Sequence, residues 1–316
     1  MSEPIRLLTA LGVPGSPARV DAPTRPPFRI GAVQHRWHPD PAEHRAALAE
    51  GVRMAAGEGA ELVCLQELTL SPYFAITADG PAAVGAEPEP LPGGPTFEFA
   101  AGLAVETGAA VHASLYERPA ADEGDPADGL GFNTAIVVTP AGELAARTRK
   151  LHIPITAGYY EDKYFRPGAG AYPVVGLGEA RFGFPTCWDQ WFPELARAYS
   201  LGGADVLVYP TAIGSEPDHP GFDTQPLWQQ VIVGNGIANG TFMVAVNRIG
   251  EESPLTFYGS SFVSDPYGRV LVQAPRDEPA VLVADLDIDQ RHDWLTLFPF
   301  LTTRRPDTYG PLVDEG

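Results

Sequence analysis

The alternation of two kinds of segment is the feature that most constrains the fold of this chain. Short runs rich in apolar and β-branched residues predict strands, and they recur between longer stretches with helical periodicity. The predicted strands are residues 28–34, 61–67, 109–117, 133–139, 180–187, 204–211, 241–247, 258–265, 269–273 and 280–288. The predicted helices are residues 41–57, 95–107, 193–201 and 225–239, and the first three begin with a proline, which suits a first helical turn. This order predicts a layered α/β domain.

Domain organisation follows from the uniformity of the chain. Neither a break in composition nor a repeat of fixed period divides the 316 residues, so we expect one large domain at residues 28–297. Residues 1–27 are predicted to be an N-terminal extension, since the apolar run after Arg6 is a poor match to a signal peptide. Residues 298–316 show little periodicity, and we predict a tail that could pack on a partner subunit or simply fray.

Charge and cysteine content narrow the partners and the compartment. A net charge of −19 repels phosphate groups, so nucleic acid and anionic membranes are not expected partners, whereas cationic small molecules are mildly favoured. No apolar run reaches the roughly 18 residues that a membrane-spanning helix needs. The two cysteines, Cys64 and Cys187, cannot form a disulfide scaffold, so a cytoplasmic location is the default expectation.

Several motifs of other enzyme classes are missing from the sequence. It contains no G-x-S-x-G, H-E-x-x-H, C-x-x-C or G-x-x-x-x-G-K-[ST] pattern, and its seven histidines are scattered. These absences disfavour a zinc or dinucleotide enzyme, although ligands that meet only in the folded chain stay open.

Two predicted strand ends carry residues suited to catalysis. Glu67 ends an apolar strand, where a carboxylate held among apolar neighbours can serve as a general base; the alternative is a solvated glutamate. Cys187 lies where another strand turns into a helix, and backbone N–H groups near the helix start favour a thiolate and could form an oxyanion hole. The alternative is an inert buried cysteine, which describes Cys64 better.

A lysine in a chain that otherwise uses arginine is a third candidate. Lys150 and Lys163 are the only lysines among 21 basic residues. The compact charge of Lys150 could stabilise a developing oxyanion, although a solvated surface charge is the simpler reading of that residue alone.

Taken together, Glu67, Lys150 and Cys187, each in its own flanking sequence, resemble the nitrilase superfamily of carbon–nitrogen hydrolases. The resemblance runs from about Arg29 to Tyr309 and is nearest to the N-carbamoylputrescine amidases. The stretches that carry it are residues 65–68, 150–154, 187–194, 209–217, 247–250 and 257–262. It implies a four-layer α-β-β-α sandwich that forms a homodimer or higher homo-oligomer through a helical layer, with no metal and no organic cofactor.

The resemblance also implies roles for individual residues. Cys187 would be the nucleophile and Glu67 the general base, and Lys150 would stabilise the tetrahedral intermediate together with the backbone N–H of Trp188. Glu161 matches a second glutamate that assists and orients. As substrate contacts we expect Tyr73, Trp191 and Glu216.

The implied reaction is cleavage of a small N-carbamoyl amine, such as N-carbamoylputrescine, to the amine, carbon dioxide and ammonia through a thioester. Residues 155–158 and 225–227 depart from the charged pattern usual in the putrescine-type enzymes, which leaves the amine open. The alternatives are an N-carbamoyl amino acid hydrolase, an aliphatic amidase, a nitrilase, or a binding or assembly protein without catalysis.

Overall fold

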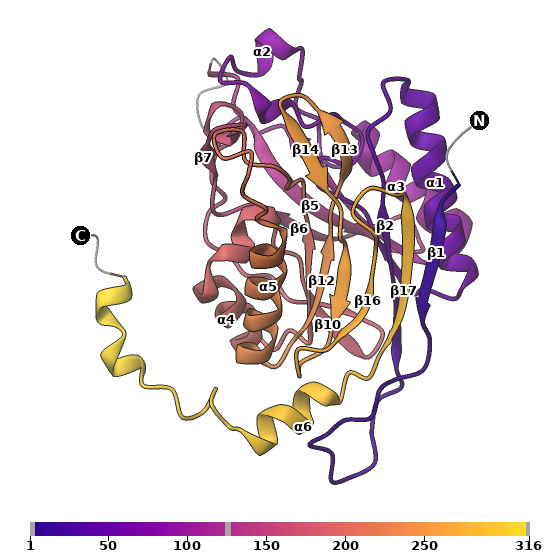
Figure 1. Cartoon of the computed structure of the whole chain (residues 1–316), viewed down its shortest axis with the longest axis vertical. Coiled ribbons are helices and arrows are strands. Elements are labelled where there is room, and N and C mark those ends of the chain that lie inside the picture. The colour runs from indigo at the N-terminus through magenta and orange to yellow at the C-terminus, as the bar shows by residue number, and fades with distance from the viewer. Residues whose placement is uncertain (1–3, 124–127, 314–316) are drawn as a thin grey trace.

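Two β-sheets lie face to face in the centre of the molecule, and helices cover their outer sides (Figure 1). The computed structural model describes residues 4–123 and 128–313. The seven-stranded sheet has the order β1 (Arg6–Ala10), β17 (Ala280–Leu286), β2 (Phe28–Gln34), β3 (Leu62–Cys64), β4 (Ala110–Glu117), β5 (Phe132–Val138) and β6 (Leu144–Arg149). The six-stranded sheet has the order β16 (Val270–Gln273), β15 (Phe262–Ser264), β12 (Phe242–Val246), β11 (Val206–Pro210), β10 (Ala180–Gly183) and β9 (Val175–Leu177).

Each sheet carries one pair of long helices on its outer face. Helices α1 (Pro41–Gly57) and α3 (Pro95–Thr107) pack on the seven-stranded sheet, and α4 (Pro193–Leu201) and α5 (Gln225–Asn239) pack on the six-stranded sheet. All four helices have the predicted bounds. The arrangement confirms the predicted α-β-β-α sandwich.

The core follows the two-residue period of the strands. In β2, the side chains of Ile30 and Ala32 belong to the apolar cluster between the sheets, whereas Val33 belongs to the cluster under α1 and α3. Helix α1 can approach β2 closely because Gly51 has no side chain: a Cβ atom there would lie 2.5 Å from Cγ1 of Val33. Successive residues of one strand thus hold two layers together.

Several shorter elements lie outside the two main sheets and their covering helices. They are α2 (Pro81–Val84), the hairpins β7 (Ile155–Thr156) with β8 (Tyr159–Tyr160) and β13 (Ile249–Glu252) with β14 (Leu255–Tyr258), and 3₁₀ turns at Phe74–Ile76, Glu161–Lys163, Cys187–Trp191, Pro306–Thr308 and Gly310–Leu312. Helix α6 (Gln290–Leu297) follows the last strand. Among the described residues, no helix combines the length and apolar character needed to span a membrane.

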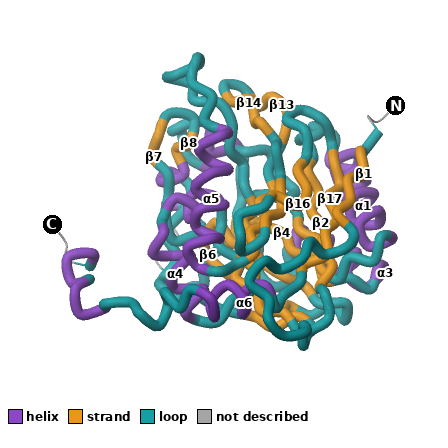
Figure 2. Tube along the Cα trace, turned by 60° about the horizontal axis from the view of Figure 1, so that its bottom comes forward, coloured by secondary structure: helices purple, strands orange, loops and turns teal. Residues whose placement is uncertain are grey.

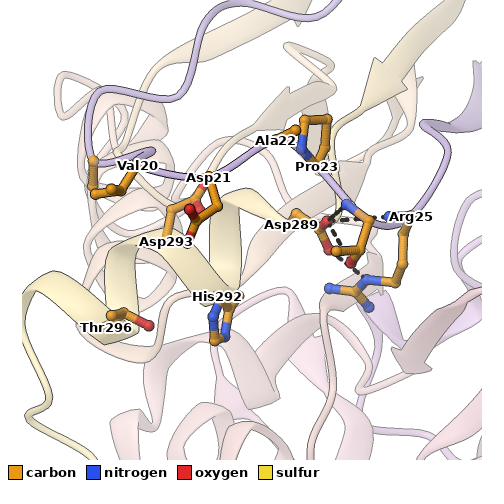
Figure 3. A pocket seen from close by; sticks show the side chains of 11 residues that line it. Val20, Asp21, Ala22, Pro23, Arg25, Asp289, His292, Asp293 and Thr296 are labelled. Atoms are coloured by element: carbon orange, nitrogen blue, oxygen red, sulfur yellow. Dashed lines mark hydrogen bonds and ion pairs between the residues drawn. The ribbon is translucent and has the colours of Figure 1, made fainter.

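The predicted N-terminal extension takes part in the fold. Residues Arg6–Ala10 form β1, which pairs with β17 in parallel register at the edge of the seven-stranded sheet. The following segment runs along α6 and encloses a cavity of about 400 Å³ with it (Figure 3). Arg19 lies 2.7 Å from Asp287 and 2.8 Å from Asp293, and Nε of Arg25 lies 2.7 Å from Asp289. These ion pairs hold the segment against the domain.

The predicted tail leaves the body after α6. Figures 1 and 2 show the chain beyond α6 extending away from the two sheets, with the C-terminus beyond α4. Phe298, Leu312 and Val313 are exposed along it. The last residues of the predicted tail, 314–316, lie outside the described residues.

Candidate active site

The cysteine singled out from the sequence lies in a short turn between two sandwich elements. Strand β10 ends at Gly183, earlier than predicted, and Cys187 begins a 3₁₀ turn that leads into α4. Its backbone has a φ of 39°, a left-handed conformation that is rare for residues other than glycine and is typical of functional positions. Cys187 is largely buried, yet it lines an open cavity.

Asp189 connects this turn to the segment that carries Lys150. Its carboxylate accepts the backbone N–H of Thr186 at 3.1 Å and that of His152 at 3.0 Å, and it lies 2.7 Å from Nδ1 of His152. The His152 ring also stacks on Phe192 at a centroid distance of 3.5 Å. His152 therefore fixes the relative position of two site segments.

Glu67 lies in a turn after β3, which is shorter than predicted and ends at Cys64. The next residue, Leu68, is also left-handed, with a φ of 48°. The buried guanidinium of Arg248 donates through Nη2 to the carbonyls of Glu67, Leu68 and Ser71 at 3.0 to 3.2 Å. This turn aims the Glu67 side chain toward Lys150.

Lys150 joins two carboxylates in a fully buried cluster. Its Nζ atom lies 3.0 Å from Oε1 of Glu67, and 2.8 and 2.7 Å from the two carboxylate oxygens of Glu161. All three side chains are essentially inaccessible to water. The hydroxyl of Tyr73 donates to Glu161 at 2.8 Å, and Nδ2 of Asn133 donates to Oε1 of Glu67 at 2.7 Å.

The charges of the cluster set the protonation of its members. Burial lowers the pKa of Lys150, but Glu161 and Glu67 outweigh burial and hold it above its ordinary value, so Lys150 is an ammonium. Burial raises the pKa of Glu161, Lys150 opposes this, and the charge of Glu67 adds to it, so the pKa of Glu161 lies above the usual carboxyl range.

The cysteine is a neutral thiol in this environment. Burial raises the pKa of Cys187 well above its ordinary value, and Glu67 raises it further, whereas Lys150 lowers it. Burial and the nearby carboxylates thus oppose the thiolate that the helix start was expected to favour. A neutral thiol needs a base to remove its proton as it attacks, and the buried glutamates are the bases nearby.

The cavity in front of Cys187 has a volume of about 410 Å³. Its wall is formed mainly by apolar and aromatic residues, with a few polar ones: Pro154, Thr156, Tyr159, Glu161, Cys187, Trp188, Trp191, Ile213, Glu216, His219, Phe222, Thr224 and Leu227. The wall thus includes Trp191 and Glu216, two of the three expected substrate contacts. It does not include Tyr73, which is buried behind Glu161.

The other predicted site residues lie together at this cavity. Glu161 and Cys187 line its wall. Glu67 and Lys150 lie behind the wall, where Lys150 contacts both Glu67 and Glu161. Trp188 is the second residue of the 3₁₀ turn, where backbone N–H groups have no partner inside the turn. Within the described residues, no group of three or more His, Cys, Asp or Glu side chains is placed to hold a metal ion.

Some residues of the site escaped sequence reasoning. Asn133 and His219 stand outside the stretches that carry the resemblance, and Arg248 stands in one of them without a predicted role. The contacts that Asn133 and Arg248 make in the site join residues far apart in the chain. Asn133, for example, contacts a carboxylate 66 residues away. A buried asparagine at the start of an apolar strand was the one available signal.

Known proteins share the family and the fold of this chain. Residues 29–295 match the carbon-nitrogen hydrolase family. The chain is 37% identical over 296 residues to an N-carbamoylputrescine amidase from Solanum lycopersicum, covering 90% of this chain and 94% of that protein. It is 32% identical over 291 residues to a citrullinase from Francisella tularensis subsp. tularensis, covering 90% and 98%.

A solved structure extends the agreement to three dimensions. The carbon-nitrogen hydrolase from Helicobacter pylori G27 superposes with a TM-score of 0.79 and 31% identity, covering 92% of this chain and 99% of that one. With a matched family, similar relatives over nearly the whole length and the same fold, the chain belongs to the carbon–nitrogen hydrolase family of the nitrilase superfamily.

Proposed function

We propose that this amidohydrolase cleaves the ureido group of a small N-carbamoyl amine and that Cys187 is its nucleophile. The observation that carries the proposal is the buried cluster of Glu67, Lys150 and Glu161 beside a neutral Cys187 at the wall of a cavity. A cluster of this kind supplies a base, a fixed positive charge and a second carboxylate in a site from which water is excluded.

The proposed reaction has two halves. Glu67 takes the proton of Cys187 as Sγ attacks the carbonyl carbon, and Lys150 and the backbone N–H of Trp188 stabilise the oxyanion. Collapse breaks one C–N bond, the leaving nitrogen takes the proton from Glu67, and a thioester remains on Cys187. Glu67 then activates a water molecule that hydrolyses the thioester. The released carbamic acid decomposes, so that the products are the amine, carbon dioxide and ammonia.

Glu161 favours an amide or ureide over a nitrile. Its carboxylate lies at the cavity wall and can accept a hydrogen bond from a substrate N–H. A ureide offers N–H groups next to the reacting carbonyl, whereas a nitrile offers none. Glu161, held in place by Lys150 and Tyr73, is therefore suited to accept an N–H group of a carbamoyl substrate.

The far part of the cavity favours an amine at the other end of the substrate. Glu216 contributes a carboxylate to the wall, where it accepts a hydrogen bond from Thr224 at 3.2 Å. Among the wall residues that the structure describes there is neither arginine nor lysine, so a substrate carboxylate would meet no permanent positive charge. The N-carbamoylputrescine amidase among the relatives supports the same substrate class.

We also propose that a second copy of the chain covers the outer face of α4 and α5. Leu201, Leu227 and Ile237 are exposed on these helices, and the tail beyond α6 runs out from the two sheets past α4 (Figures 1 and 2). A groove of about 600 Å³ lies between α4 and the tail. Burial of these apolar side chains in a subunit interface would remove them from water.

The experiment that tests the proposed function compares three ureides. Ammonia release is measured from N-carbamoylputrescine, N-carbamoyl-β-alanine and citrulline, with Cys187→Ala as the blank. We expect Cys187-dependent turnover of N-carbamoylputrescine and little from the two acids. Turnover of citrulline alone would instead assign the activity of the bacterial relative, and turnover of none would contradict a ureide substrate.

A second arm isolates the recognition of the amine. Butylurea has a similar length to N-carbamoylputrescine but lacks the ammonium group. Replacement Glu216→Gln should raise KM for N-carbamoylputrescine roughly ten- to a hundredfold, the value of a hydrogen bond to a charged group, and leave KM for butylurea unchanged. Equal effects on both substrates would contradict a role for Glu216 in binding the amine.

A further inference from the structure

The two oxygens of the Glu67 carboxylate have different surroundings. Oε1 accepts hydrogen bonds from Nζ of Lys150 at 3.0 Å and from Nδ2 of Asn133 at 2.7 Å. Oε2 is equally buried but makes no hydrogen bond to any residue that the structure describes. The carboxylate is therefore anchored through one oxygen, and the other is free to exchange a proton.

Asn133 is well placed to be one of the two anchors. It is the second residue of β5 and is completely buried. Its backbone carbonyl accepts the N–H of Lys150 at 2.8 Å, so one residue contacts both the base and the lysine. Its side-chain oxygen accepts a hydrogen bond from Ser114 at 3.4 Å, and Ser114 in turn accepts the N–H of Leu68 at 3.1 Å, in the Glu67 turn.

We infer that Asn133 is a positioning residue for the amidohydrolase reaction proposed above: with Lys150 it fixes Oε1 of Glu67, so that Oε2 takes the proton from Cys187 and later from water. The terminal torsion of a glutamate is broad, and a single bond from Lys150 would leave the carboxylate free to turn. Two donors on the same oxygen remove that freedom before substrate arrives. In each half-reaction the proton moves from sulfur or water to Oε2 and then to the leaving group.

The neighbouring residue provides a matched control. Thr134 is also fully buried, and its hydroxyl donates to Oε2 of Glu117 at 2.6 Å. Because successive residues of a strand face opposite sides, this bond lies on the other face of the sheet from Glu67. Thr134→Val therefore removes a buried hydrogen bond from β5 to a glutamate of the neighbouring strand β4 without touching the cluster around Lys150.

The test compares Asn133→Leu, which keeps the shape of the side chain without its donor, with Thr134→Val. Asn133→Ala is measured alongside, so that a folded variant is available if leucine does not fit. Melting temperatures report the structural cost, which we expect to be similar at the two positions. On the best ureide, we expect Asn133→Leu to lower kcat by about 10- to 100-fold with KM changed by less than about twofold, as for misplacement of a catalytic group.

One further readout separates positioning from stability. Alkylation of Cys187 by iodoacetamide, followed by mass spectrometry and needing no substrate, should slow in the Asn133 variants and stay unchanged in Thr134→Val. Folded Asn133 variants that keep the wild-type kcat and the wild-type rate of Cys187 alkylation would overturn the inference.

The alkylation readout also keeps this inference apart from the proposed function on which it rests. A wild-type protein that releases no ammonia from any ureide would contradict the proposed substrate. Slower alkylation of Cys187 in the Asn133 variants would still support the positioning of Glu67. If the wild type turns over a ureide normally but the Asn133 variants are alkylated at the wild-type rate, only the role of Asn133 is contradicted and the proposed function stands.

Discussion

Lys150 and Glu161 form a buried ion pair in which Nζ contacts both carboxylate oxygens, at 2.7 and 2.8 Å. The same Nζ atom holds Glu67 at 3.0 Å, so one ammonium balances two carboxylates in a space that water does not reach. Taking charges out of water is expensive unless each has a partner. The stability of the site and its chemistry therefore depend on the same three residues.

Removal of the Lys150 charge should damage both properties. Lys150→Met leaves two carboxylates buried without a cation, and we expect it to reduce the free energy of unfolding by about 3–5 kcal/mol and kcat by about 10²–10³. Urea denaturation and ammonia release measure the two effects. Lys163→Met is the matched control, because Lys163 is the only other lysine and lies half exposed beside Asp162. An active, stable Lys150→Met variant would contradict the account of the cluster.

The geometry of Arg248, and not its charge alone, should hold the Glu67 turn. Nη2 serves three carbonyls while Nη1 contacts Glu252 at 2.6 Å, a set of directions that a lysine cannot reproduce. We expect Arg248→Lys to cost about 1–3 kcal/mol through carbonyls left without donors, and to lower kcat. Arg276→Lys, at an exposed ion pair with Asp223, should change neither quantity. An Arg248→Lys variant with unchanged stability and kcat would show that the Glu67 turn does not depend on the guanidinium.

Acid should loosen the N-terminal segment shown in Figure 3. Burial raises the pKa of Asp289, but hydrogen bonds from Arg25 and Thr24 outweigh it and hold the pKa of this carboxyl below its usual range. A depressed pKa stabilises the fold above the unfolded value of about 3.9, and this contribution is lost as pH falls toward the folded value.

The replacement Asp289→Asn tests this pH dependence. At pH 7 it should reduce the free energy of unfolding by about 1.5–3 kcal/mol, the value of hydrogen bonds to a charged group. Melting temperatures of wild type and variant should converge as the pH is lowered below about 4. A constant difference between pH 7 and pH 3 would contradict a charge-dependent contact.

Deletion of the tail should weaken self-association. A chain that ends at residue 297 loses Phe298, Leu312 and Val313, which are exposed beyond α6. We expect sedimentation velocity to show a dimer or larger assembly for the full chain and a shift toward monomer for the shortened one. A full chain that sediments as a monomer at micromolar concentration would contradict the proposed second copy.

Local sequence patterns predicted those helices and strands whose boundaries are marked by a single clear signal. Prolines at the first turns of α1, α3 and α4 marked where these helices begin. Strand β6 was not predicted, because arginine and threonine in Leu144–Arg149 hide its alternation. The predicted strand 258–265 is broken between β14 and β15, where Gly259 and Ser260 adopt left-handed conformations. The pairing of β6 with β5 and the break between β14 and β15 both depend on contacts between distant parts of the chain.

The site was predicted to the extent that motifs carry it. Glu67, Lys150, Glu161 and Cys187 each stand in a recognisable stretch, and the structure brings them together. Asn133 could not be found this way, because its contact with Glu67 depends on the register of β4 and β5 beside the β3 turn. The neutral state of Cys187 also depends on burial and on carboxylates from distant parts of the chain.

The proposed hydrolysis depends on the thiol of Cys187, so exchange of each cysteine in turn separates the nucleophile from a bystander. Ammonia release from N-carbamoylputrescine is measured for the wild type, Cys187→Ala and Cys64→Ala, the last removing the only other cysteine, which is fully buried in β3. We expect that Cys64→Ala retains turnover and that Cys187→Ala loses it to the background level. Turnover that persists in Cys187→Ala would contradict Cys187 as the nucleophile.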